Sequence, residues 1–261
     1  MKNCKICGSG KNRVTFQKDK WEVIECLECK HGITSPVPTQ SELEKIYNGE
    51  YYDNRYTEKR NLNQIIRHER HRIKLLKRYH DQGDILDVGY GDGGFMIALS
   101  ESGYCPIGID LSSTHSLMLK RSHGIDTFTD FNQIKKKFKA ITLWHTLEHH
   151  LMPEDTIRSV QNLLSSDGIL IVEVPNISSY DRYAEKANWA GWELPLHINH
   201  FSLKSLQVFF NKYDFKILNI NHYHSNAKKK ELSKKGLPKF LCRFISSFYP
   251  STSLCMTMKM Y

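Results

Sequence analysis

The sequence predicts an α/β fold, in which a mostly parallel sheet carries helices on both faces and a small cysteine-rich unit precedes it. Three observations support this prediction. From residue 84 onward, short apolar runs alternate with amphipathic ones, a glycine-rich turn follows the first apolar run, and two C-x-x-C pairs lie within the first 29 residues. A chain of 261 residues can bury one sizeable core with a small appendage.

The alternation assigns the elements in order along the chain. Strands are expected at 84–89, 105–110, 126–129, 139–145 and 168–174, and helices at 94–102, 113–122, 154–166 and 203–213. Two further strands are expected in "FKILNINHY" and "STSLCMTMKM". Because a long excursion separates these two, we expect the last of the seven strands to lie antiparallel beside its predecessor.

The composition divides the chain into three parts. Residues 1–38 are expected to form the cysteine-rich unit, residues 39–60 a polar and tyrosine-rich linker, and residues 61–261 the α/β domain. The domain begins with a helix predicted over 61–80 and carries a basic amphipathic insertion at 228–250.

The cysteines predict a zinc ribbon. Cys4 and Cys7 form one pair and Cys26 and Cys29 the other, with eighteen residues between the pairs, a spacing that lets four thiolates converge on one zinc ion. A closed site of this kind is usually structural. A catalytic zinc, which needs an open coordination position, and a redox dithiol, which needs only one pair, are the alternatives.

The glycine-rich turn in "DILDVGYGDGGF" fits two patterns. Read from Gly89, it matches the dinucleotide fingerprint G-x-G-x-x-G; read from Asp87, it matches D-x-G-x-G-x-G. In a parallel sheet, ligands bind beyond the carboxyl ends of the strands, where this turn approaches them most closely. The pattern alone therefore leaves two classes of ligand open.

The carboxylates favour a cationic ligand over a pyrophosphate. Asp87 ends the first strand and Asp92 lies in the turn, so a phosphate placed there would face two negative charges, whereas a sulfonium and an amino group would be attracted. Asp110, which ends the second strand, suits ribose hydroxyls in either case. Taken singly, Asp87 could be a turn former and Asp92 a helix N-cap.

These residues resemble the class I S-adenosylmethionine-dependent methyltransferases, whose fold is a Rossmann-like, doubly wound, seven-stranded sheet. "ILDVGYGDGGF" resembles their first motif, "IGID" their second, and "FKAITLWHTLEHHLMP" the motif after the fourth strand, while "FTDFNQI" resembles the segment that flanks the adenine. The resemblance covers about residues 60 to 220. It implies that S-adenosylmethionine is the cofactor and that it contacts Asp87, Gly89, Tyr90, Gly91, Gly93, Asp110, Leu111, Asp130 and Phe131.

A narrower resemblance concerns the acceptor. The ribbon, "YYDNRY" and "WAGWELPLHINHFSLKSLQVFF" are similar to features of bacterial methyltransferases that tailor sugars, polysaccharides or natural products. The chain departs from the family pattern at Tyr90, where Cys or Ala is common, and at Lys139, where Asp is usual. The resemblance implies a small-molecule acceptor, sugar-related and with an oxygen or carbon nucleophile. Quinone or RNA methylation and non-catalytic binding of S-adenosylmethionine are the alternatives.

Histidines are the candidate general bases, because an acceptor hydroxyl or an enolisable carbon must lose a proton. The candidates are His145 at the end of the fourth strand, and His197 and His200 in "LPLHINHFS". His145 could instead contact the cofactor or fill space, His197 and His200 could be loop histidines with satisfied hydrogen bonds, and Glu148 with His149 could simply hold the loop. A histidine-only metal site is a further alternative; its members would be His145, His149, His150 and His197.

Aromatic residues near this region have two interpretations. They could form the wall of a substrate pocket by stacking, or they could belong to local cores. The residues concerned are Tyr51, Tyr52, Tyr56, Trp189 and Trp192.

The basic charge is concentrated in the tail, since residues 228–261 contribute +7 of the net +9. Leu237, Phe240, Leu241, Phe244, Ile245 and Phe248 form an apolar stripe at helical spacing among these charges. Such a helix could pack on the sheet edge, lie on an anionic membrane, or bind RNA together with the ribbon. With no signal sequence or apolar run of about 18 residues, we expect a cytoplasmic protein with, at most, peripheral membrane contact.

Overall fold

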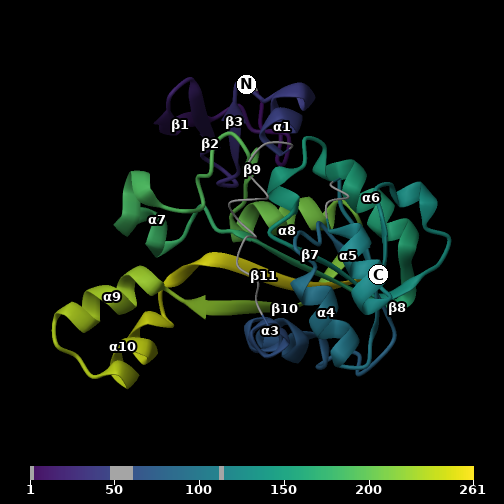
Figure 1. Cartoon of the computed structure of the whole chain (residues 1–261). Coiled ribbons are helices and arrows are strands. Elements are labelled where there is room, and N and C mark those ends of the chain that lie inside the picture. Colours follow the sequence, from purple (N-terminus) through teal and green to yellow (C-terminus); the bar gives the residue numbers. More distant parts are fainter. Residues whose placement is uncertain (1–2, 48–60, 112–114) are drawn as a thin grey trace.

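The computed structural model describes residues 3–47, 61–111 and 115–261 and contains two sheets (Figure 1). The larger sheet has seven strands in the order β10-β11-β8-β7-β4-β5-β6. Its strands are β4 Asp84–Val88, β5 Cys105–Ile109, β6 Asp126–Phe128, β7 Phe138–Trp144, β8 Leu164–Pro175, β10 Phe215–His224 and β11 Pro250–Met260. The smaller sheet has four strands in the order β1-β2-β3-β9.

The large sheet confirms the predicted fold class. Strands β4 to β8 pair in parallel with their neighbours, and β11 pairs antiparallel with both β8 and β10. Strand β10 therefore runs in the same direction as β8, and its carboxyl end lies at the same edge of the sheet as the ends of β4, β5 and β7. This edge is where parallel α/β sheets bind their ligands.

Alternate side chains of the central strands pack on opposite faces of the sheet. Ile141 and Leu143 of β7 belong to a core cluster that includes residues of α6 (Pro153–Leu163) and α8 (Leu203–Asn211). Ala140 and Trp144 belong to a second cluster, which includes residues of α3 (Leu62–Leu76) and α4 (Gly94–Glu101). The central strands are thus buried on both faces, as expected for a parallel sheet.

The remaining helices are short. They are α1 Gln40–Tyr47, α5 Ser116–His123, α7 Tyr180–Glu185, α9 Asn226–Lys234 and α10 Lys239–Ser246, with 3₁₀ turns η1 Phe131–Gln133, η2 Leu147–His149 and η3 Lys186–Asn188. Helix α6 ends at Leu163, earlier than the periodicity predicts, because Leu164 already pairs with Phe138 in β7.

The small sheet combines two distant parts of the chain. Strands β1 Asn12–Lys18, β2 Trp21–Cys26 and β3 Gly32–Ser35 form an antiparallel unit, and β9 Asn199–His200 pairs antiparallel with β3. Arg182 of α7 also reaches back to Glu25, with 3.4 Å between Nη2 and Oε2. The cysteine-rich unit is therefore joined to the α/β domain by backbone pairing and by buried side chains. The predicted division at residues 38 and 60 stays a prediction.

The basic insertion forms a helical hairpin, α9 and α10, between β10 and β11 (Figure 1, lower left). It leaves the sheet where β10 ends, at the carboxyl edge of the parallel strands. Across the described ranges, we find no helix with the length and apolar character that a membrane crossing requires.

Candidate active site

The glycine-rich turn adopts a conformation that depends on its glycines. Gly89, Gly91 and Gly93 have φ values of +76°, +55° and +76°, a region that other residues seldom occupy. A Cβ at Gly89 would lie 2.4 Å from the Thr146 side chain, which follows β7. The turn between β4 and α4 is thereby held close to the end of β7, and only glycine fits this contact.

Asp87 lies behind this turn rather than on the surface. Its side chain is 2% exposed and accepts a hydrogen bond of 2.7 Å from Thr142 Oγ1 in the neighbouring strand β7. Burial raises the pKa of Asp87 to about 7, although the Thr142 hydrogen bond opposes the rise. A carboxyl group in this situation is readily ionised by a cationic group placed near it.

Asp110 and Asp92 have different roles in the turn. Asp110 follows β5, and its Oδ2 accepts a hydrogen bond of 3.1 Å from the Gly91 N–H, which fixes the carboxylate beside the turn. Asp92 Oδ1 accepts from the Gly94 N–H at 2.9 Å, at the start of α4. The helix N-cap that the sequence allows at Asp92 is instead Gly93, and Asp92, one residue before it, contacts the first helical N–H.

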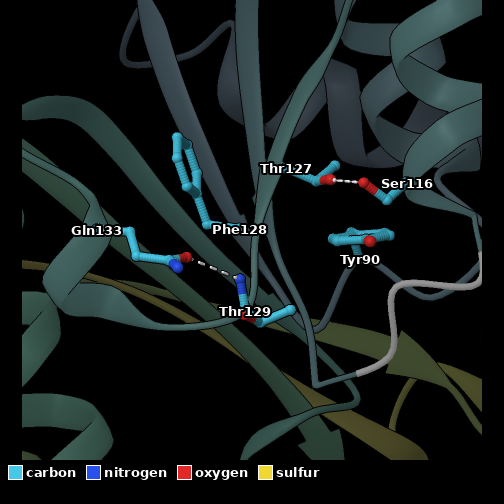
Figure 2. A pocket seen from close by; sticks show the side chains of 6 residues that line it. All are labelled: Tyr90, Ser116, Thr127, Phe128, Thr129 and Gln133. Atoms are coloured by element: carbon cyan, nitrogen blue, oxygen red, sulfur yellow. Dashed lines mark hydrogen bonds between the residues drawn. The ribbon is translucent and has the colours of Figure 1, made fainter.

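A cavity of about 380 Å³ lies beside the turn (Figure 2). Its lining residues are Tyr90, Ser116, Thr127, Phe128, Thr129 and Gln133. Tyr90 departs from the family pattern, and the chain accommodates its ring because residue 108 is glycine: a Cβ there would lie 2.5 Å from Tyr90 Cδ1. The size falls within the usual range for small-molecule sites, about 300–1,000 Å³.

The cavity lies beside the predicted adenine-flanking residues but is lined by their neighbours. Asp130 is exposed and accepts a hydrogen bond of 2.8 Å from the Asn132 N–H at the start of η1, and Phe131 packs partly against the main core. Leu111, just after Asp110, is 80% exposed. The sequence did not reveal the lining residues Ser116, Thr127, Phe128, Thr129 and Gln133. Strand β6 has only three residues, which is too few for an alternating pattern to show which of its side chains face the cavity.

His145 lies at the carboxyl end of β7, between two carboxylates. Its Nε2 is 3.1 Å from Glu173 Oε1, and its Nδ1 is 3.4 Å from Glu148 Oε1. Burial alone would lower the pKa of His145, but the neighbouring carboxylates of Glu148 and Glu173 outweigh it and raise this pKa to about 9. The imidazole is therefore protonated at neutral pH. Its φ of +53° is an unusual backbone conformation for a residue other than glycine.

The other two candidate histidines lie farther along the same region and are buried. His197 Nδ1 lies 2.9 Å from the Gly191 carbonyl, and its Nε2 lies 3.2 Å from Glu193 Oε2. His200, in β9, is 2% exposed, with its Nε2 3.1 Å from Thr34 Oγ1 of β3. Burial lowers the pKa of His200 well below its usual value. His145 and His197 thus share the surroundings of Glu148, while His200 faces the small sheet.

The tryptophans belong to a local core. Trp189 and Trp192 are 2% and 5% exposed, and Trp192 stacks on Phe16 of β1 with ring centroids 4.3 Å apart. They pack between the loop and the small sheet instead of forming a pocket wall. Tyr51, Tyr52 and Tyr56 lie outside the described residues.

The four predicted cysteine ligands come together. Cys4 Sγ is 3.6 Å from Cys29 Sγ, Cys7 Sγ is 3.5 Å from Cys26 Sγ, and all four sulfur atoms lie within 4.8 Å of one another. A tetrahedral zinc site with Zn–S bonds of about 2.3 Å needs sulfurs about 3.8 Å apart. The hydrogen bond from Cys29 lowers the pKa of Cys4 to about 5. The donor set therefore fits zinc.

Comparison with known proteins agrees with this geometry. Residues 56–220 match a protein family described as "Methyltransferase domain". The chain belongs to the methyltransferase-domain family. The predicted enzyme class is thereby confirmed. No curated protein matches this methyltransferase by sequence.

Solved structures show the same fold at low sequence identity. Magnesium protoporphyrin IX methyltransferase from Synechocystis with bound SAH is 14% identical, with a TM-score of 0.57, covering 85% of this chain and 100% of its own. The 1,6-didemethyltoxoflavin-N1-methyltransferase of Burkholderia thailandensis is also 14% identical at a TM-score of 0.57, covering 96% and 100%. An S-adenosylmethionine-dependent methyltransferase from Clostridium acetobutylicum is 13% identical at 0.51, covering 82% and 98%.

Proposed function

We propose that this methyltransferase transfers a methyl group from S-adenosylmethionine to an oxygen or carbon nucleophile of a small molecule, sugar-related in kind. The observation that carries the proposal is the meeting of three features at one sheet edge: the glycine turn backed by Asp87, the neighbouring cavity, and the histidine-carboxylate cluster after β7.

The chain's own residues suit this donor. Asp87 would supply negative charge near the cationic methionine part, and Asp110, fixed by Gly91, would accept hydrogen bonds from the ribose hydroxyls. The cavity lined by Tyr90 and Phe128 would take the adenine, with Leu111, Asp130 and Phe131 at its margin. S-adenosylmethionine supplies an activated methyl group, so the protein mainly orients the acceptor and excludes water.

The histidines would handle the acceptor's proton. Because His145 is protonated at neutral pH, it would act by donating a hydrogen bond to an acceptor oxygen and by orienting Glu173. His197, whose Nε2 faces Glu193, is the better candidate for a base. His200 would act as a positioning residue, since β9 holds it against Thr34.

The four cysteines would hold a structural zinc ion. Cys4, Cys26 and Cys29 are buried and pack with Phe201 in the main core, and Cys7 completes the set. Four protein ligands leave no open position for catalysis, so the ion would stabilise the small sheet and, through β9, the loop that carries His197.

The helical hairpin would make peripheral contact with an anionic membrane surface from the cytoplasmic side. Phe240, Phe244 and Phe248 are 71%, 62% and 72% exposed, with Lys239 and Arg243 beside them. The hairpin lies at the carboxyl edge of the sheet, where the acceptor would bind. A glycan carried on a lipid is an acceptor that this arrangement would suit.

Thermal unfolding tests the donor. S-adenosylmethionine or S-adenosylhomocysteine at 100 times its dissociation constant should stabilise the native protein by about 2.7 kcal/mol, and NAD should have no effect. A shift with NAD alone would overturn the proposal.

The class of acceptor is tested by measuring the transfer of a labelled methyl group to sugar nucleotides and lipid-linked sugars. Transfer to quinols or to RNA instead would favour those competing classes of acceptor. Turnover on none of these, with donor binding retained, would indicate a non-catalytic binding protein.

A further inference from the structure

Glu148 is a buried carboxylate whose surroundings do not satisfy it. It lies in η2, its side chain is 0% exposed, and among the described residues neither of its oxygens has a hydrogen-bond partner. A carboxylate in such a place is costly to bury unless a cation compensates it.

His145 compensates this charge only in part. Its Nδ1 is 3.4 Å from Glu148 Oε1 but lacks the geometry of a hydrogen bond, and its Nε2 is engaged with Glu173 at 3.1 Å. Glu173 also accepts a hydrogen bond of 2.9 Å from the Tyr223 hydroxyl. One imidazolium thus faces two carboxylates, and Glu193 adds a third within this region.

The two other histidines are each held through their Nδ1 atom. His149 Nδ1 lies 3.0 Å from the Leu196 carbonyl and His197 Nδ1 lies 2.9 Å from the Gly191 carbonyl. Because a carbonyl oxygen only accepts, each Nδ1 carries a proton, which leaves Nε2 of each ring as the nitrogen that a cation would bind. In His197 this atom faces Glu193 Oε2 at 3.2 Å. Protein histidines that bind metals are usually held in this way, by donating the other ring N–H to a carbonyl or carboxylate.

We propose that Glu148, His149 and His197 form a binding site for a divalent first-row transition-metal cation. One ligand atom from each lies within 4.8 Å of the others, and His197 Nε2 is 4.0 Å from Glu148 Oε1. A zinc ion with bonds of about 2.1 Å would need donor atoms about 3.4 Å apart. Small side-chain rotations would bring these three donors together.

The donor set determines the class of cation. Two imidazoles and one carboxylate favour Zn²⁺, Co²⁺ or Fe²⁺ over Mg²⁺ and Ca²⁺, which prefer oxygen ligands. Three protein ligands leave at least one coordination position open. The cluster follows β7 at the edge where the methyl donor would bind. On the proposed function, the open position would take an acceptor oxygen, and the cation would lower the pKa of its hydroxyl, replacing His197 as the group that activates the acceptor. Cation binding itself does not depend on this role.

The experiment measures cation binding apart from turnover. The full chain, without a histidine tag, is first loaded with one equivalent of Zn²⁺ to fill the cysteine site and is then titrated with Co²⁺. We expect one further equivalent to bind, with weak visible absorption and without the thiolate-to-cobalt charge-transfer band that a cysteine-bound ion would give. Absence of this second binding event in the wild-type protein would overturn the proposal, whatever the variants do.

Variants assign the ligands. Glu148→Gln and His197→Gln should each weaken the second site by at least about 100-fold and leave the cysteine site loaded. His123→Asn, at the end of α5, is the matched control and should bind Co²⁺ as the wild type does. Circular dichroism establishes that each variant is folded. Unchanged second-site affinity in both folded variants would overturn the assignment, and donor binding measured in parallel reports separately on the proposed function.

Discussion

Thr142 Oγ1 donates a hydrogen bond of 2.7 Å to Asp87 Oδ1, which links β7 to the residue beneath the glycine turn. This contact holds a buried carboxyl group whose pKa is raised to about 7, so its protonated and ionised forms are both populated near neutral pH. The ionisation of Asp87 is therefore sensitive to any cation bound in the turn.

Binding of S-adenosylmethionine should strengthen as pH rises from 6 to 8, because a cationic ligand favours the ionised form of Asp87. Without ligand, the raised pKa has the opposite effect on folding: the folded state binds more protons than the unfolded one, so stability falls as pH rises from about 4 to 7. Asp87→Asn should remove both dependences. Calorimetry of binding and unfolding at several pH values checks this, and an identical pH profile in the variant would contradict it.

Gly89→Ala should abolish donor binding or lower the unfolding temperature by several degrees. The alanine would need a φ of +76°, which is unfavourable for it, and its Cβ would lie 2.4 Å from the Thr146 side chain. Gly103→Ala is a matched control, because Gly103 also has a positive φ, of +87°, and among the described residues no heavy atom lies within 4 Å of its added Cβ. If both variants behave alike, backbone strain alone explains the effect and the close contact with Thr146 does not matter.

His145→Gln should destabilise the protein most at low pH. The folded-state pKa of about 9 exceeds the ordinary value of 6.5, so the stabilisation by Glu148 and Glu173 is complete below about pH 6.5 and is lost as pH rises through 9. Melting curves of wild type and variant should therefore converge between these two pH values. Histidine resonances followed by NMR give an independent reading, and a His145 midpoint near 6.5 would refute the ion-pair description.

Cys26→Ser should remove the zinc ion and lower the unfolding temperature, because a structural zinc site stabilises the folded chain directly. Metal content by mass spectrometry and melting curves measure the two effects. Cys105→Ser changes an exposed cysteine outside the cluster and serves as the control. Retention of a full equivalent of tightly bound zinc by the Cys26 variant would show that the ion binds elsewhere.

Replacing Phe240, Phe244 and Phe248 together by Ser should abolish binding to anionic vesicles without lowering the unfolding temperature, since these rings are exposed. Co-sedimentation at low and high salt separates the apolar and electrostatic contributions. Tyr183→Ser, at an exposed ring on α7, provides the matched control. Failure of the wild type to bind at low salt would rule out the membrane interpretation.

The fold and the convergence of the four cysteines were predictable because they depend on local patterns. The alternation from Asp84 to Val174 indicates which segments form the parallel strands, and the glycine turn follows the first of these strands. Likewise, four cysteines at zinc-ribbon spacing bring their sulfurs together. In the first case the information lies within individual runs of about ten residues, and in the second within the first 29 residues.

What the sequence did not reveal depends on distant pairs. Nothing near Asn199 indicates that it pairs with Ile33, and only the tertiary fold places Glu173 against His145. The same holds for the burial of Glu148, which the sequence presents as an ordinary polar loop residue. Charge environments of this kind arise from residues that are far apart in the chain.

The pairing of β3 with β9 ties the N-terminal unit to the loop that carries His197, a proposed catalytic residue. His197 lies two residues before β9, and Thr34 of β3 donates a hydrogen bond of 2.6 Å to the His197 carbonyl. If the cysteines hold the proposed zinc ion, its chelation or oxidation of the thiolates should loosen the strand that anchors this loop. On the proposed function, methyl transfer would then respond to zinc supply and thiol redox state through this backbone connection.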